Sequence, residues 1–288
     1  MIIKNVKIVN FDQTINNADI EIEGKLIKNI VIHKEGMGSR TIVPGFIDTH
    51  IHGFADYDVM EGSLAVEKIS YQLAKHGTTS FMPTAMTNKW ETILVALKNI
   101  AQTKNFTSKN LGIHIEGPYI GLEKKGAHKP EYLIKATKEN VEELFLASQK
   151  QLKKISFDPN MASIEIQNKM FELGIIPSIG HSPALYEEAK KFFDNGCYSV
   201  CHLWNAMSGV DSRKPGIVQA ALMDQKVYTE VIVDLHHIVN QTIDFTIKNK
   251  GIDKIICISD AIKPAYSADG DSISGDIPIT KKRHRNLP

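Results

Sequence analysis

The sequence has little of what marks secreted, membrane-spanning or nucleic-acid-binding proteins. It holds three cysteines among 288 residues, Cys197, Cys201 and Cys257, and an odd, sparse set predicts a reducing, cytoplasmic location rather than a disulfide framework. No apolar run approaches the ~20 residues of a membrane helix, and the N-terminus lacks the apolar core of a signal peptide. The formal net charge of +1 gives no electrostatic basis for binding nucleic acid or a membrane surface, and one basic cluster near the C-terminus does not change this.

The first 42 residues differ in pattern from the rest of the chain. Residues 4–9 alternate in part between polar and apolar side chains, residues 19–23 alternate strictly, and residues 26–32 are a third extended segment. Short strands joined by tight turns predict a small β-domain over residues 1–42. This domain is too small to be stable alone.

From residue 43 onwards, apolar strand segments alternate with helical patterns. The eight strand candidates centre on residues 46–47, 80–82, 112–115, 155–157, 176–179, 199–201, 231–233 and 255–258. Apolar stripes at helical spacing lie between them, for example Trp90, Ile93, Leu94 and Leu97. Eight strand–helix alternations predict an α/β fold, a (β/α)8 barrel over residues 43–288. A doubly wound open sheet is the alternative, but no Gly-x-Gly-x-x-Gly segment follows any strand.

Histidines and carboxylates gather where the predicted strands end. They are His50 and His52, Glu116, His181, His202, Asp234 with His236 and His237, and Asp260. His50 and His52 are two residues apart, so both imidazoles can point to one face of a strand. Imidazole and carboxylate together suit zinc, iron or manganese, and barrel enzymes carry their chemistry at the C-terminal strand ends. The pattern therefore predicts a divalent metal site, whereas Cys197 and Cys201 are interpreted as small apolar packing residues.

Five segments carry a specific resemblance. They read Pro-Gly-Phe-Ile-Asp at 44–48, His-Ile-Glu-Gly-Pro at 114–118, Gly-His-Ser at 180–182, His-Leu-Trp-Asn-Ala-Met at 202–207 and Ser-Asp-Ala at 259–261. Together they resemble the N-acetylglucosamine-6-phosphate deacetylases of the amidohydrolase superfamily. The resemblance implies hydrolysis of the acetamide of N-acetylglucosamine 6-phosphate to glucosamine 6-phosphate and acetate.

The resemblance also implies a role for each site residue. Glu116, His181 and His202 would bind the principal metal ion, zinc or iron, while His50 and His52 match members that hold a second ion. Asp260 would be the general acid and base. Substrate contacts would come from Ala127, His128, Asn205, Ala206, Arg213 and His237. Arg213 matches an arginine that reaches the sugar phosphate near a subunit interface, which implies a homodimer.

The chain departs from the resembled family in two places. The loop after the seventh strand reads Asp234-Leu235-His236-His237, where the family usually has glycine second. The family also continues past the eighth strand with a closing helix and further β-strands, so we expect a C-terminally truncated chain whose β-domain and barrel are both incomplete. Two alternatives stay open: an inactive fragment of the deacetylase, or another metal-dependent amidohydrolase such as a cyclic amide hydrolase. The second is disfavoured because no lysine stands at the end of the fourth strand, residues 157–160.

Overall fold

The computed structural model describes residues 1–282, and the basic cluster from residue 283 onwards lies outside the described residues. The chain divides into two compact units, Met1–Phe46 and Ile47–Pro288. The division lies four residues after the predicted domain boundary, at the start of a strand.

The first unit is a four-stranded sheet. Its strands are β1 (Ile2–Val9), β2 (Thr14–Glu23), β3 (Leu26–Ile32) and β4 (Arg40–Ile42), in the order β3-β2-β1-β4. β1 pairs antiparallel with β2 and parallel with β4. Val6, Ala18 and Ile20 are buried on one face, as the alternation of polar and apolar residues requires. The sequence analysis missed only β4, which is three residues long.

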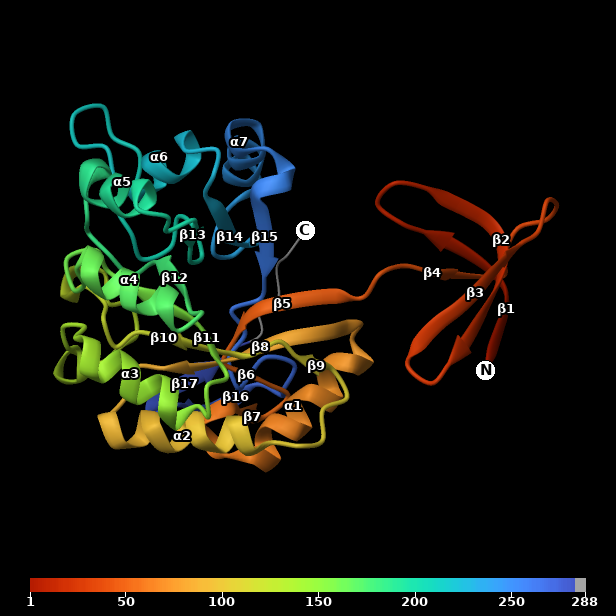
Figure 1. Ribbon diagram of the computed structural model, residues 1–288, viewed down its shortest axis with the longest axis horizontal. Helices are drawn as coiled ribbons and strands as arrows, with labels where there is room; N and C mark the ends of the chain where they lie inside the picture. Colours follow the sequence, from red (N-terminus) through yellow and green to blue (C-terminus); the bar gives the residue numbers. More distant parts are fainter. Residues whose placement is uncertain (283–288) are drawn as a thin grey trace. The chain divides into compact units, whose positions relative to one another are not determined.

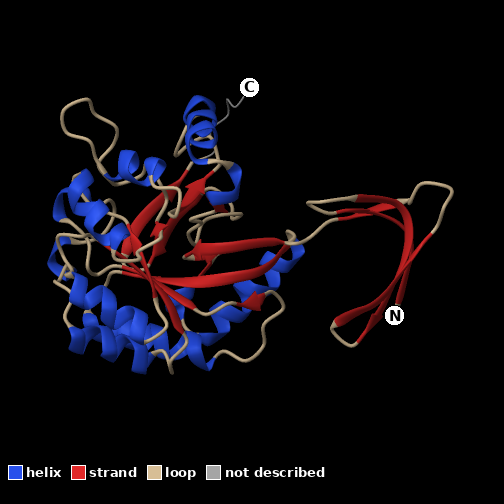
Figure 2. Ribbon diagram, turned by 45° about the horizontal axis from the view of Figure 1, so that its top comes forward, coloured by secondary structure: helices blue, strands red, loops and turns tan. Residues whose placement is uncertain are grey.

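The second unit is a nearly closed barrel of parallel strands surrounded by helices (Figures 1 and 2). Its eight strands follow one another around the barrel in chain order, so the (β/α)8 prediction is confirmed and the doubly wound alternative is wrong. The barrel strands are β5 (Phe46–Ile51), β8 (Thr78–Met86), β10 (Ile113–Glu116), β11 (Leu152–Phe157), β12 (Ile176–Ile179), β13 (Ser199–Val200), β14 (Tyr228–Ile232) and β15 (Ile255–Ile258).

Helices connect the barrel strands along the described chain. The α-helices are α1 (Ser63–Lys75), α2 (Trp90–Gln102), α3 (Lys138–Ala147), α4 (Ile164–Glu172), α5 (Tyr186–Asp194), α6 (Ile217–Met223) and α7 (Asn240–Lys250). Short 3-10 turns are η1 (Val59–Glu61), η2 (Leu122–Lys124), η3 (Pro130–Tyr132) and η4 (Ile252–Lys254). Ile93, Leu97 and Ile100 of α2 are fully buried, so the predicted apolar stripe faces the barrel. Among the described helices, none combines the length and apolarity needed to cross a membrane.

The ends of β5 and β15 close the barrel through a few backbone contacts. The amide of Asp260 donates to the carbonyl of His50 at 3.0 Å, and the amide of His52 donates to the carbonyl of Ala261 at 2.8 Å. Ile51 and Ala261 form a parallel bridge. This closure brings the first strand, which carries two histidines, beside the last strand, which carries Asp260.

Short strands lie outside the barrel ring, and the sequence analysis assigned none of them. They are β6 (Gly53–Phe54), β7 (Tyr57–Asp58), β9 (Lys109–Asn110), β16 (Gly270–Ser274) and β17 (Ile277–Lys281). β16 and β17 form an antiparallel hairpin. Ser274 and the amide of Gly275 donate to the carboxylate of Asp58 at 2.7 and 2.9 Å, which attaches the hairpin beside β7. Within residues 1–282, no helix follows β15.

The burial of Phe157 in the barrel core allows a test of which side chains stabilise this unit. Phe157 of β11 is fully buried and packs against Phe192 of α5 with ring centroids 5.4 Å apart. We expect Phe157→Ala to lower the free energy of unfolding by about 3–5 kcal/mol, because it removes buried apolar surface and leaves a cavity. Phe171→Ala, at a side chain 40% exposed on α4, is the control. Equal losses in urea denaturation of the two variants would contradict this account of the core.

Candidate metal centre

Glu116 ends β10 and lies at the centre of the candidate site. It is 4% exposed, and the next residue, Gly117, has φ of 78°. A Cβ on Gly117 would lie 2.2 Å from the Thr87 hydroxyl, so glycine allows the chain to turn sharply after the carboxylate. The carboxylate of Glu116 therefore lies where the chain leaves β10.

One oxygen of Glu116 faces two histidines from neighbouring strand ends. Oε1 lies 3.0 Å from Nε2 of His181, which follows β12, and 2.9 Å from Nε2 of His202, which follows β13. The two Nε2 atoms are 3.1 Å apart. All three residues are buried, and their ligand atoms form a compact donor triad.

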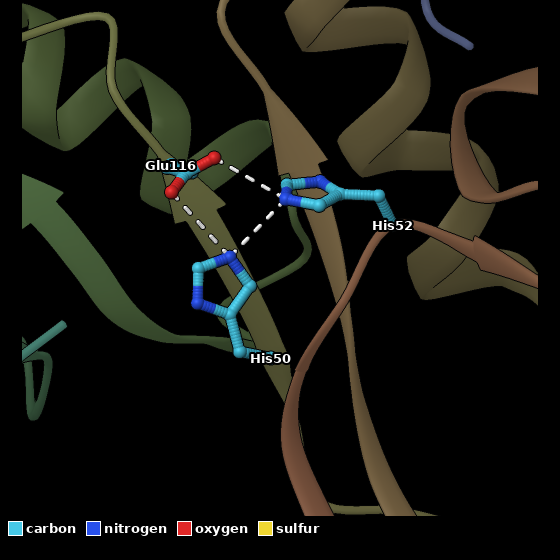
Figure 3. A group of neighbouring side chains, drawn as sticks. All are labelled: His50, His52 and Glu116. Carbon is cyan, nitrogen blue, oxygen red and sulfur yellow. Dashed lines mark hydrogen bonds and ion pairs between the residues drawn. The ribbon is translucent and has the colours of Figure 1, made fainter. Parts of the chain in front are cut away.

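The histidines of β5 form a second triad with the same carboxylate (Figure 3). The Nε2 atoms of His50 and His52 are 3.1 Å apart. Nε2 of His50 is 3.5 Å from Oε1 of Glu116, and Nε2 of His52 is 3.2 Å from Oε2. Glu116 thus stands between two histidine pairs.

The donor set fits two divalent cations. Nδ1 of His181 is 2.9 Å from the Lys124 carbonyl and Nδ1 of His52 is 3.0 Å from the Thr84 carbonyl. Each carbonyl accepts the Nδ1 proton, so the Nε2 lone pair is directed into the site. A tetrahedral zinc ion bound at ~2.0–2.1 Å requires donors ~3.3 Å apart, which is close to the distances within both triads.

The charges in this cluster depend on one another. Burial raises the pKa of Glu116, but His181 and His50 outweigh burial and hold that pKa well below its usual range. Burial opposes charge on His52, yet hydrogen bonds to Asp260 and Glu116 raise the pKa of His52 to about 9. A metal ion at these positions would replace protons on the histidines.

Asp260 follows β15 and adjoins the second histidine pair. Its Oδ1 lies 3.3 Å from Nε2 of His50 and 3.3 Å from Nε2 of His52. Burial raises its pKa, but His50 and His52 overcome this effect and lower it to about 2. Asp260 is thus an ionised carboxylate beside the candidate metal positions.

Three of the strand-end residues have a strained backbone. His181, His202 and Asp260 have φ of 47°, 22° and 49°, in or near the left-handed region that non-glycine residues avoid. Such strain costs about 1–3 kcal/mol per residue and gathers at functional sites. In this conformation His181 and His202 contact Glu116, and Asp260 contacts His50 and His52.

The predicted substrate residues fall into two sets. His128 is buried, and its Nε2 lies 3.3 Å from Oε2 of Glu116, so it adjoins the metal cluster directly. Ala127 is exposed on the same loop, while Asn205 and Ala206 are half-buried and follow His202. The amide of Ser182 donates to the carbonyl of Ala206, which ties this loop to the loop carrying His181.

His237 lines an open pocket together with Asp260. The pocket has a volume of about 890 Å³, and its lining includes Ser259, Pro264 and Lys281. His237 Nδ1 lies 2.8 Å from the Asp234 carboxylate, which also accepts from the amides of His236 and His237. Asp234 therefore shapes the loop that carries His237. Arg213 is exposed on a separate loop, where its amide donates to Asp211.

Sequence reasoning missed a layer of polar side chains beneath His50. Cys201 Sγ lies 3.4 Å and Glu230 Oε2 lies 3.6 Å from Nδ1 of His50. Lys154 forms an ion pair with Glu230, and both side chains are almost completely buried. The available signal was a charged residue inside each of two apolar strand segments. Cys197, by contrast, is a packing residue, and burial raises the pKa of its thiol to about 12.

Comparisons with known proteins agree with this geometry. Residues 41–274 match the model of the amidohydrolase family, a metal-dependent family, and this defines the class of the protein. Within this class, the chain belongs to the N-acetylglucosamine-6-phosphate deacetylase family. It is 31% identical over 280 residues to the N-acetylglucosamine-6-phosphate deacetylase of Lysinibacillus sphaericus, covering 91% of this chain and 71% of the relative.

Other relatives act on a related sugar or share the structure. The chain is 32% identical to the N-acetylgalactosamine-6-phosphate deacetylase of Escherichia coli O157:H7, covering 80% of this chain and 62% of that one. The crystal structure of the Thermotoga maritima N-acetylglucosamine-6-phosphate deacetylase superposes with a TM-score of 0.86 at 29% identity, covering 98% of this chain and 76% of that one. The chain therefore spans about two thirds of the length of the relatives that it matches.

The His52 environment predicts how metal binding depends on pH. In the metal-free chain His52 keeps a proton up to a pKa of about 9, and a metal ion must displace it. We expect zinc binding at neutral pH to release protons, and the affinity to rise with pH towards 9, because the pKa of His50 and of His202 is also raised above its usual value. Calorimetric titrations in buffers of different ionisation enthalpy measure the release. Binding without proton release would contradict this assignment.

Proposed function

We propose that this chain hydrolyses the acetamide of N-acetylglucosamine 6-phosphate to glucosamine 6-phosphate and acetate. The observation that carries the proposal is the juxtaposition of Asp260 with four histidines around Glu116, at the mouth of an open pocket. The names of the relatives support the substrate, and the carboxylate–imidazole donors support metal-dependent chemistry.

The carboxylate of Glu116 belongs to both of the proposed ligand sets. Glu116, His181 and His202 would hold the principal ion, and His50 and His52 would hold a second ion on the other side of Glu116. Zinc and ferrous iron both suit this donor set. When bound, such an ion lowers the pKa of water and polarises the acetamide carbonyl.

Asp260 performs the proton transfers in this proposal. Its carboxylate is ionised and one fifth exposed, so it borders both the histidine cluster and the pocket. It accepts a proton from the attacking water and then donates it to the leaving amine of the sugar. His128 contacts the same oxygen of Glu116 as His52 does, and it would donate a hydrogen bond to the substrate.

The remaining residues would bind the phosphorylated sugar. Asn205 and Ala206 lie on the loop after His202, and His237 lines the pocket beside Asp260. Arg213 would supply a charge-assisted hydrogen bond to the phosphate, and this selects a phosphorylated sugar over the free sugar. The arginine would lie near the interface of a homodimer in the cytoplasm.

The galactosamine epimer is a second candidate substrate, because the E. coli O157:H7 relative is named for it. A lysine-dependent cyclic amide hydrolase is less well supported. Lys154 of β11 donates to Glu230 and to the carbonyl of Thr49 beneath the site, so its ammonium group is already paired away from the pocket.

Asp260→Asn tests the reaction. In the proposed mechanism it removes the proton acceptor, and we expect kcat for amine release from N-acetylglucosamine 6-phosphate to fall roughly 10²–10⁴-fold. Asp194→Asn, at an exposed position of α5, is the matched control and should retain activity. Parallel assays with N-acetylgalactosamine 6-phosphate rank the two sugars. A soluble, zinc-loaded chain that turns over neither sugar would refute the proposal and favour the inactive fragment.

Arg213→Ala tests the phosphate contact. Loss of one charge-assisted hydrogen bond corresponds to roughly a 10- to 100-fold rise in KM for the phosphorylated sugar. Activity on the free sugar, where measurable, should stay the same. Light scattering on both proteins tests the homodimer. An unchanged KM would remove Arg213 from the proposed substrate site.

A further inference from the structure

Glu230 lies inside the barrel, one layer below the metal ligands. It belongs to β14 and is 2% exposed. Its Oε1 accepts hydrogen bonds from the Thr49 hydroxyl, at 2.7 Å, and from the Lys154 ammonium group. Lys154 also donates to the carbonyl of Thr49 at 3.0 Å. One carboxylate oxygen of Glu230 is thus held by side chains from two other strands, β5 and β11.

The other oxygen of Glu230 has no hydrogen-bond partner within 3.5 Å among the described residues. The nearest ring nitrogen is Nδ1 of His50, 3.6 Å away. A buried carboxylate oxygen without a partner costs free energy. A small rotation of the His50 ring on metal binding would complete this hydrogen bond.

His50 stands between Glu230 and the proposed metal site. Its Nε2 faces Glu116, His52 and Asp260, while its Nδ1 faces the opposite way. A neutral imidazole that offers a lone pair on Nε2 carries its proton on Nδ1, and an acceptor at Nδ1 fixes this tautomer. We propose that Glu230 is a positioning residue, whose carboxylate holds the proton of His50 on Nδ1 and so directs the Nε2 lone pair at the second metal ion. This inference rests on the proposed role of His50 as a ligand.

Lys154 explains why Glu230 can serve as an acceptor. The ammonium group of Lys154 is almost completely buried and pairs with Oε1 of Glu230, so the positive charge of Lys154 balances the carboxylate charge of Glu230. Glu230 therefore stays ionised. His52 and His181 face neutral backbone carbonyls instead, so the carboxylate makes His50 the more basic ligand.

Cys201 is the competing partner of His50. Its Sγ lies 3.4 Å from Nδ1, and His50, Cys201 and Glu230 together offer three buried donor atoms. Thiol sulfur is a weak hydrogen-bond acceptor. A further cation at these three donors would lie next to the Lys154 ammonium group, which repels it.

The test is the zinc affinity of Glu230→Gln. The glutamine oxygen would stay with Lys154 and Thr49, so its amide group would face Nδ1 of His50 as a donor and disfavour the required tautomer. We expect the second zinc ion to bind about 10- to 100-fold more weakly, while the first ion binds as in the parent. Competition with a chromophoric chelator on the metal-free chain measures both affinities.

Two further variants separate positioning from charge balance. Lys154→Met/Glu230→Gln removes both charges, so it should fold even where the single variant does not, and the second ion should still bind weakly. Restored zinc affinity in this double variant would overturn the proposal, because Glu230 would then serve only to neutralise Lys154. Cys201→Ala should leave both affinities as in the parent. A weak second ion in Cys201→Ala with normal binding in Glu230→Gln would assign the role to Cys201 instead.

The parent chain distinguishes this inference from the proposed function. A parent that binds two zinc ions but releases no amine would refute the deacetylase reaction and leave the role of Glu230 to the affinity measurements. A parent that binds one ion would remove His50 from the ligands and overturn the inference, whether or not amine is released.

Discussion

The candidate site depends on a single buried carboxylate, Glu116, which is surrounded by imidazoles. Nε2 atoms of five histidines lie 2.9–3.5 Å from the oxygens of Glu116. So many imidazole nitrogens can lie close together in a buried site only where protons or metal cations bind them. The barrel supplies the geometry, because parallel strands β5, β10, β12 and β13 all end at one rim.

The polar side chains inside the barrel lie in two layers. The upper layer holds the histidines, Glu116 and Asp260, which border the pocket. The lower layer holds the Lys154–Glu230 pair and His114, whose ring nitrogens contact Thr84 and Ser156 at 3.1 and 2.8 Å. A buried ion pair adds little stability compared with apolar packing. Its position below His50 agrees with the proposed role of Glu230 in orienting that ring.

The sequence was sufficient for the barrel and for the gathering of histidines, but not for the Lys154–Glu230 pair of the lower layer. Strand positions follow from apolar segments, and strand ends share one rim in any parallel barrel. Whether Lys154 and Glu230 point inwards depends on strand register and tilt, which local sequence does not specify. The β16–β17 hairpin pairs locally, from Gly270 with Lys281 to Ser274 with Ile277, and the sequence analysis missed it. The contact of its turn with Asp58 is long-range, so only the fold provides it. Cys201 was interpreted as a packing residue, since only the fold places it against His50.

The left-handed backbone of His181, His202 and Asp260 bears on how this chain can change over time. At such positions glycine relieves strain, so a substitution that destroys a ligand or the base can also make the fold more stable. Selection for abundance alone would therefore favour glycine at these three positions, against the function proposed for them.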